Sequence, residues 1–176
     1  VVHGSTVATN AALEGKGVKT AFITNRGFAD MLTLGRQTRL DLYDLRPSRL
    51  EPPVPAPLCL ETGGRLDANG NIVEPLTEPD LAALKAQIAK LQPDAVAINL
   101  LFSFLDPSAE KAIAAAMPDT VFVSCSSTVL PEYKEYERGM ATWLNAWLGP
   151  KVARYLRQLQ HCLLYTSPSP RDLSTS

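Results

Sequence analysis

The chain has 176 residues, a length that suits one domain or one and a fraction. A hydrophobic content of 45% supports a core, while a net charge of −1 without a basic cluster points away from nucleic acid and anionic membrane surfaces. No apolar run reaches a transmembrane length, and no signal peptide is visible. The three cysteines (Cys59, Cys125 and Cys162) lack metal-ligand spacing. We therefore expect a cytoplasmic protein with reduced thiols.

The first ten residues predict a strand, a turn and a helix. Val1–Val2 ends the strand, Gly4 permits a tight turn, and the hydroxyls of Ser5 and Thr6 can cap the first free N–H groups of the helix. Thr6 and Asn10 are four apart and share a helical face. A helix start of this kind suits a bound phosphate or carboxylate, and it equally suits a capped turn without a ligand.

The next segment predicts a parallel sheet. Residues 18–24 are β-branched and aromatic, as in a strand, and residues 29–34 form a short helix that ends at Gly35. This alternation of strand and helix is typical of parallel sheets. Residues 38–57 are irregular, with alternating charges and four prolines in the last six positions, and predict either a functional loop or a solvated one.

An antiparallel hairpin is expected to follow. Residues 58–61 predict a strand, Asn69-Gly70 is a turn signal, and Ile72-Val73 begins the return strand. The hairpin would be an insert on the parallel sheet.

Residues 77–101 predict a helix and a central strand. Thr77 and Asp80 have the spacing of a capping box, and apolar residues recur at helical intervals until Pro93. Residues 94–101 are almost continuously apolar, as in a strand buried on both faces. Asn99 inside this strand needs a hydrogen-bond partner, because an unpaired buried amide costs about 1–3 kcal/mol.

Residues 103–110 predict a loop that leads into a helix. Asp106 would cap the helix, Pro107 would occupy its first turn, and Glu110 would interact with the helix dipole. This local explanation needs no catalytic role for Glu110. Residues 121–124 predict the next strand.

A long helix is expected from Pro131, broken at Gly149-Pro150 and continued in a second piece. Its apolar stripe predicts a core or interface face and comprises Tyr133, Tyr136, Met140, Trp143, Leu144 and Trp147. After Gln160 the helical pattern gives way to Ser, Thr and Pro, and we expect residues 161–176 to be a non-native tail.

Several blocks, in order, resemble the hydantoinase/oxoprolinase family. They are His3–Asn10, Gly27–Asp30, Gly35–Gln37, Asp41–Leu45, Ser103–Glu110, Glu135–Arg138 and Leu144–Pro150. Ala29 replaces the family's usual arginine, and the Thr62-Gly63-Gly64 spacer also departs from its pattern. The Gly35–Gln37 and Glu135–Arg138 motifs resemble those of hydantoinase A-type subunits more than those of eukaryotic-type 5-oxoprolinases.

The resemblance implies an α/β fold with a mainly parallel sheet and flanking helices, part of an actin-like (ribonuclease H-like) ATPase. It places the family's N-terminal region at residues 1–125 and the first helices of a following hydantoinase A-type domain at 126–160. It implies a fragment of an ATP- and Mg²⁺-dependent hydrolase of small cyclic amides, whose D-x-G-G-T phosphate loop would lie upstream. The resemblance leaves open an ATP-dependent ketone carboxylase, or a non-catalytic module that binds a B-type subunit or a second copy.

The resemblance also implies site residues. We expect catalytic roles for His3, Thr6 and Asn10, and substrate or phosphate binding by Gly4, Ser5, Thr9, Arg36 and Arg138. His3 is alternatively a structural hydrogen-bonding group, and each arginine is alternatively a member of a structural ion pair. Zinc hydantoinases need clustered histidines, and His3 is the only histidine outside the expected tail.

Overall fold

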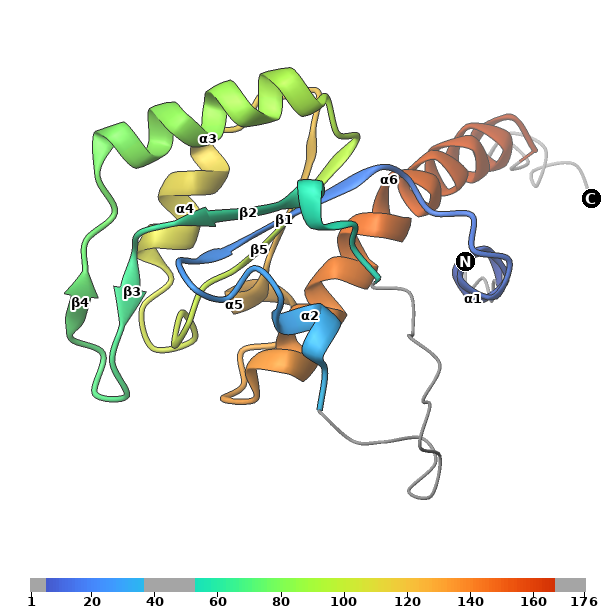
Figure 1. Ribbon diagram of the computed structural model, residues 1–176. Helices are drawn as coiled ribbons and strands as arrows, with labels where there is room; N and C mark the ends of the chain where they lie inside the picture. The colour runs from blue at the N-terminus through green and yellow to red at the C-terminus, as the bar shows by residue number, and fades with distance from the viewer. Residues whose placement is uncertain (1–5, 37–52, 167–176) are drawn as a thin grey trace, which may run out of the picture.

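The four main strands form one parallel sheet, in the order β2-β1-β5-β6. The computed structural model describes residues 6–36 and 53–166, with side chains described as far as residue 160. The strands are β1 (Thr20–Asn25), β2 (Cys59–Thr62), β5 (Ala95–Asn99) and β6 (Phe122–Cys125). From β1 the chain moves to one side to form β2 and then crosses to the other side to form β5 (Figure 1). The order in which strands are added therefore reverses between β1 and β5, which run parallel to each other.

Helices cover both faces of this sheet (Figure 1). Helices α3 (Glu78–Leu91) and α4 (Ser108–Ala115) cover one face, and α2 (Met31–Leu34) and α6 (Glu135–Thr166) cover the other. The short elements are α1 (Val7–Leu13), η1 (Ala56–Leu58) and α5 (Ser126–Val129). The expected α/β class with a parallel sheet and flanking helices is confirmed.

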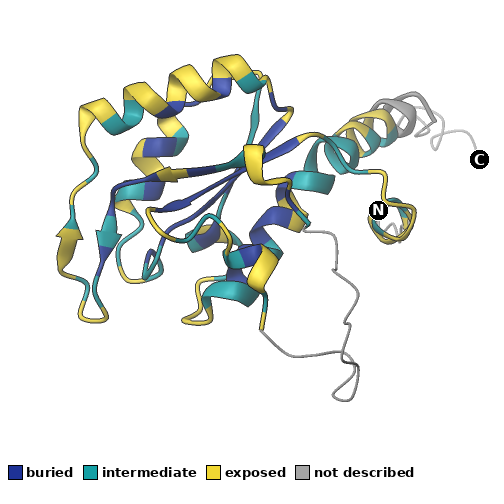
Figure 2. Ribbon diagram, in the orientation of Figure 1, coloured by how far each residue is buried: buried dark blue, intermediate teal, exposed yellow. Residues whose placement is uncertain are grey.

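Strands β1 and β5 lie at the centre of the sheet, and every one of their residues is buried (Figure 2). Alternate residues of each strand enter different cores. Ile23 and Ile98 pack against α3 and α4, whereas Phe22 packs on the opposite face with Trp143 of α6. The prediction of a central strand at residues 94–101 is therefore confirmed.

The aromatic stripe of α6 is mainly a core face. Trp143 is buried and stacks on Trp147, with ring centroids 5.1 Å apart. The expected stripe is wrong at its edges, because Tyr133 precedes the helix and Leu144 is exposed. Because Trp143 is buried, fewer aromatic residues of the stripe are available to a partner than the sequence pattern suggests.

The expected hairpin forms, but as a separate two-stranded sheet of β3 (Arg65–Leu66) and β4 (Ile72–Glu74). The side chain of Asp67 fixes its turn by accepting hydrogen bonds from the backbone N–H groups of Asn69 and Asn71. Residues 58–61 were expected to be its first strand, and instead most of them form the parallel edge strand β2. Gly64, with φ +86°, turns the chain between the two sheets.

Helix α6 differs most from the sequence prediction. It is continuous for 32 residues, with Pro150 inside it, starts at Glu135 rather than Pro131, and extends past Gln160 to Thr166. Proline removes one helical hydrogen bond, but its φ is compatible with a helix. Gly149 packs so closely against the Phe122 ring that an added Cβ would lie 2.5 Å from it, which anchors the helix at the expected break.

The remaining differences from the sequence predictions are local. Thr6 precedes α1 without a side-chain capping bond, and α5 was not anticipated. The predicted strand and turn at residues 1–5, and residues 37–52 of the predicted irregular loop, lie outside the described residues. Among the described helices, none combines the length and apolarity needed to cross a membrane.

The predicted capping box of α3 is present, and it makes stability depend on pH. Thr77 and Asp80 exchange side-chain and backbone hydrogen bonds, and the Thr77 hydroxyl, with a smaller contribution from Arg26, lowers the pKa of Asp80 below its ordinary value of 3.8. A lowered carboxyl pKa contributes stability that is complete above the ordinary value and is lost as pH falls through the folded value.

We therefore expect Asp80→Asn to destabilise the chain by about 1 kcal/mol at pH 7, and by progressively less as pH falls below 4. Thermal unfolding at pH 7 and pH 3 measures this difference. Glu78→Gln, in the same helical turn, is the control and should change little. A deficit for Asp80→Asn that is the same at both pH values would contradict the prediction.

Candidate functional site

The carboxyl ends of the four parallel strands form one edge of the sheet, where ligands bind in open α/β folds, especially where the strand order reverses. The chain leaves this edge through the segments that follow β1, β2, β5 and β6. The beginning of α6 packs against the same edge. Together with the last residues of the strands, these segments hold most of the buried polar side chains of the described residues.

Arg138 is the centre of the polar network at this edge. Its side chain is completely buried and donates hydrogen bonds to Asn99 Oδ1 (2.9 Å), the carbonyl of Leu100 (2.7 Å) and the carbonyl of Glu132 (2.8 Å). Its guanidinium also lies over the Phe104 ring, 5.4 Å from the centroid. Burial lowers the pKa of Arg138, but an arginine remains charged.

Asn99 has the partners that its position in an apolar strand requires. It accepts from Arg138, and its amide donates to the carbonyl of Glu135 at 3.3 Å. The pair joins the end of β5 to the start of α6. No local pattern relates these residues, which are 39 positions apart.

Glu110 is a second buried connector. Its carboxyl group accepts hydrogen bonds from the Leu100 N–H (3.0 Å) and the Ser127 N–H (2.9 Å). It also accepts from the Ser126 hydroxyl (2.6 Å), which in turn lies 3.0 Å from that of Ser103. Glu110 lies in the first turn of α4, as predicted, but its side chain is also fully buried and binds residues that follow two different strands.

Asn25 connects the loops that follow the neighbouring strands. Its side chain accepts from the Leu101 N–H at 2.7 Å and donates to the carbonyl of Gly63 at 3.3 Å. Phe102, the next residue in this loop, has φ +57°, a conformation that costs a non-glycine residue free energy. The network around Asn25 and Arg138 therefore holds a strained loop at the edge of the sheet.

The outer rim of the edge carries an exposed ion-pair cluster. Arg26, directly after β1, pairs with Glu74 of the hairpin and Asp80 of α3. Glu61 accepts from the backbone N–H groups of Gly27 (2.9 Å) and Ala29 (3.2 Å). The Arg26–Glu74 pair attaches the hairpin to the sheet, and the Glu61 contacts fix the segment that follows β1.

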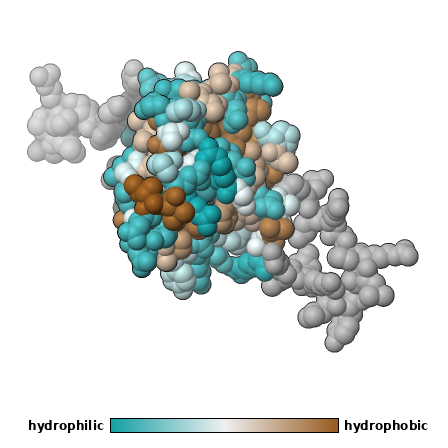
Figure 3. All heavy atoms as spheres, turned by 60° about the vertical axis from the view of Figure 1, so that its left-hand side comes forward, coloured by the Kyte–Doolittle hydropathy of each residue, from teal (hydrophilic) through white to brown (hydrophobic). Residues whose placement is uncertain are grey.

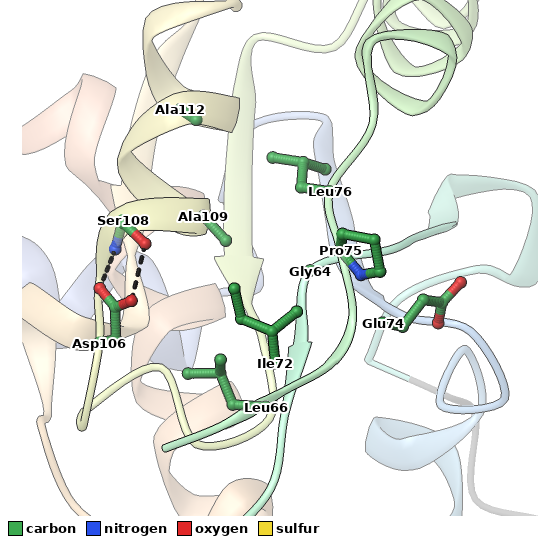
Figure 4. Close-up of a pocket in the computed structure, with 10 residues that line it drawn as sticks. All are labelled: Gly64, Leu66, Ile72, Glu74, Pro75, Leu76, Asp106, Ser108, Ala109 and Ala112. Atoms are coloured by element: carbon green, nitrogen blue, oxygen red, sulfur yellow. Dashed lines mark hydrogen bonds between the residues drawn. The ribbon is translucent and has the colours of Figure 1, made fainter.

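A cavity of about 300 Å³ opens beside the hairpin (Figure 4). Its lining residues are Gly64, Leu66, Ile72, Glu74, Pro75, Leu76, Asp106, Ser108, Ala109 and Ala112. Three large apolar side chains nearby are exposed to solvent, namely Ile72 (67%), Val73 (60%) and Leu105 (47%). Figure 3, in which the hairpin side comes forward, shows a hydrophobic patch on this face.

The residues predicted as one site lie at two separate places. Thr6, Thr9 and Asn10 are exposed on or next to α1, which precedes β1 and contacts α6 (Figure 1). Asn10 donates to the Thr6 hydroxyl at 3.4 Å, in agreement with their predicted common face. His3, Gly4 and Ser5 lie outside the described residues.

The two predicted arginines lie at the carboxyl edge instead. Arg36 is exposed and pairs with Glu137 at 2.8 Å, while Arg138 is buried, with all three guanidinium nitrogens hydrogen-bonded. Six-residue β1 separates this edge from α1, a span of about 20 Å. The contacts of both arginines favour the structural interpretation that the sequence left open.

The two cysteines among the described residues are half-buried free thiols. Burial raises the pKa of both, that of Cys125 to about 11. Because the thiolate is the reactive form, neither is suited to nucleophilic catalysis. Within the described part of the chain, His, Cys, Asp and Glu side chains form no cluster that could hold a metal.

Two cavities near the ends of the parallel sheet do not fit the phosphates of ATP. The cavity beside the hairpin has no basic residue among those that line it. A second cavity, of about 410 Å³, includes Arg154 and Arg157 but also Asp94 and Asp119, and it lies at the opposite, amino end of the sheet. We therefore assign no nucleotide contact to these residues.

The parallel sheet and its flanking helices define an open α/β domain, whose topology places candidate ligand sites at the carboxyl edge. The family profile described as the hydantoinase/oxoprolinase N-terminal region matches residues 1–121, and the chain belongs to this family. The resemblance stated from the sequence is thus confirmed.

Relatives include an uncharacterised protein of Methanocaldococcus jannaschii, MJ0964, which is 38% identical over 89% of this chain and 24% of its own length. The caprolactamase alpha subunit of Pseudomonas jessenii is 34% identical over 90% of this chain and 23% of its own. The crystal structure of the ATP-dependent caprolactamase from this bacterium superposes with a TM-score of 0.77 over 90% of this chain and 24% of that chain, at 34% identity.

A nucleotide-free acetone carboxylase structure superposes with a TM-score of 0.80 over 90% of this chain and 24% of that chain. At 22% identity, this likeness shows the fold alone. The chain spans about a quarter of the length of these relatives.

Proposed function

We propose that the chain is the N-terminal part of an enzyme that hydrolyses a cyclic amide at the expense of ATP. The observation that carries this proposal is the 34% identity to an ATP-dependent caprolactamase alpha subunit over 90% of the chain. A yeast (Saccharomyces cerevisiae) 5-oxoprolinase, 29% identical over 89% of the chain, supports the same reaction class.

The chemistry explains why such a reaction needs ATP. Amide resonance makes an unstrained ring slow to open, and phosphorylation of the carbonyl oxygen would create a good leaving group. Mg²⁺ would accompany ATP in this proposal. The described residues would contribute the carboxyl edge and the cavity beside the hairpin.

The proposal is tested on the intact parent protein, by measuring ATP hydrolysis with hydantoin, 5-oxoproline or ε-caprolactam. We expect one of these rings to raise the rate of phosphate release and to appear as the ring-opened product. ATP turnover that no cyclic amide stimulates would contradict it.

The second candidate is ATP-dependent carboxylation of a ketone. The acetophenone carboxylase gamma subunit of Aromatoleum aromaticum, 26% identical over 83% of the chain, favours it. Turnover that requires both a ketone and bicarbonate would establish this reaction in place of hydrolysis. Relatives named as alpha and gamma subunits support assembly with further subunits in either case.

The segment His3–Asn10 remains part of the proposal, as a second contact region for substrate or phosphate. Its support is the family resemblance together with the exposure of Thr6, Thr9 and Asn10. His3 would hydrogen-bond the developing negative charge or transfer a proton, and Gly4 and Ser5 would approach the anion. Arg36 would add an anion contact only if its ion pair with Glu137 opens.

We expect Ser5→Ala combined with Thr6→Ala to lower ATP-coupled turnover of the intact parent by about 10²-fold, because two candidate donors to the anion are removed. The melting temperature should change little, since Thr6 is exposed and forms no capping bond. Leu13→Ala, at an exposed position of the same helix outside the predicted site, is the comparison. Unchanged turnover in the double variant would remove this segment from the mechanism.

A further inference from the structure

The cavity beside the hairpin lies where the sheet topology favours a ligand. Gly64 follows β2, and α4 begins after the loop that leaves β5, so both walls extend from the carboxyl edge. Figure 4 shows Leu66, Ile72 and Leu76 on the hairpin side of the cavity, with α4 opposite them.

Small residues create the space. Gly64 has φ +86°, and a Cβ at this position would lie 3.1 Å from the Cβ of Ala109 and 3.4 Å from Leu100. On the facing side of α4, the short side chains of Ala109 and Ala112 leave room for the cavity. The resulting volume of about 300 Å³ is at the lower end of the range for small-molecule sites, which suits a single small ring.

The charges at the cavity discriminate between ligands. Its ionisable residues are Glu74, paired with Arg26, and Asp106, which accepts hydrogen bonds from the N–H and hydroxyl of Ser108. These bonds lower the pKa of Asp106, which is therefore ionised at neutral pH. Arg26 already pairs with Glu74, and Lys111 acts on Asp106 from outside the lining, so no Lys or Arg lines the cavity to pair with a bound anion and the cavity disfavours one.

We propose that this cavity binds the ring of an uncharged cyclic amide and excludes cyclic amides that carry a carboxylate. Ring methylenes would contact Leu66, Ile72 and Leu76, and the ring N–H would donate to Asp106. This inference rests on the proposed function and deepens it, because it separates lactam-type substrates from oxoproline-type substrates.

The first experiment fills the cavity from the α4 side. Ala112 lines the cavity and is exposed, so Ala112→Leu adds volume without disturbing the core. We expect it to raise KM for ε-caprolactam in the intact parent about tenfold or more. Ala115→Leu, at an exposed position of the same helix outside the cavity lining, should leave KM unchanged.

The second experiment adds a cation. Ile72→Arg should shift the ratio of kcat/KM values from ε-caprolactam towards 5-oxoproline by about tenfold, because a guanidinium would attract the carboxylate. Val73→Arg is the matched control, since Val73 is its exposed neighbour on β4 but does not line the cavity. If the hairpin had only a structural role, Ile72→Arg would leave the ratio of kcat/KM values for the two substrates unchanged.

The outcomes separate the two proposals. Equal KM values for Ala112→Leu and Ala115→Leu, with lactam hydrolysis intact, would overturn the cavity assignment and leave the proposed function standing. If no cyclic amide is hydrolysed, binding of ε-caprolactam to the intact parent, measured by ligand-detected NMR, still decides the cavity assignment. Binding that Ala112→Leu weakens supports it, and binding that neither variant weakens, or no binding at all, overturns it.

Discussion

Replacing Arg138 with methionine is expected to destabilise the domain by about 3–5 kcal/mol, a large part of the stability of an ordinary domain. Methionine has a similar length but no donors, so Asn99 Oδ1 and the carbonyls of Leu100 and Glu132 would lose their partner inside the protein. Hydrogen exchange of β5 and the start of α6 measures the local loss. The melting temperature measures the global one.

Arg36→Met is the control, because it removes an exposed arginine from an ion pair and should cost at most about 1 kcal/mol. Arg138→Lys keeps the charge but cannot reach three acceptors in different directions, and should recover only part of the loss. If Arg138→Met behaved like Arg36→Met, the network would not support the carboxyl edge.

Glu110→Ala is expected to have the second largest effect, about 3 kcal/mol or more. Alanine would leave the buried N–H groups of Leu100 and Ser127 and the Ser126 hydroxyl without their acceptor. Hydrogen exchange at residues 100 and 127 would rise together, although they follow different strands.

Glu110→Gln refines this prediction. The amide retains one acceptor oxygen but presents an NH₂ group to a donor, so we expect a loss of about 1–3 kcal/mol. A glutamine variant as stable as the original would show that one oxygen satisfies the site. Exchange that rises at only one of the two segments would show that Glu110 does not join them.

The elements that the sequence predicts well are those whose cause is local. The capping box of Thr77 and Asp80, the turn at Asn69-Gly70 and the apolar run of β5 each involve residues within a few positions of one another. The predicted break in α6 fails because a proline weakens a helix without being obliged to end it, and packing of Gly149 against Phe122 holds the chain in place.

The carboxyl-edge network could not be predicted from the same kind of signal. Glu110 has a complete local explanation as a helix-start residue, and nothing near it in sequence indicates Ser126 or Leu100. Asn99 did carry a usable signal, because an amide in an apolar strand must be paired, but its partner lies 39 residues away. The cavity was equally hidden, since Gly64 and Ala109 become neighbours only when the segment after β2 packs against α4.

The continuity of α6 has a mechanical consequence. Trp143 and Ala146 attach the first half of the helix to the sheet, whereas none of residues 149–160 is buried. The 16 residues from Lys151 to Thr166 therefore form a lever about 24 Å long, with Pro150 as its natural pivot. A tilt of about 5° there displaces Thr166 by about 2 Å. Because Pro150 removes a helical hydrogen bond, a force on the outer half of the helix bends it there and leaves the segment that carries Arg138 in place.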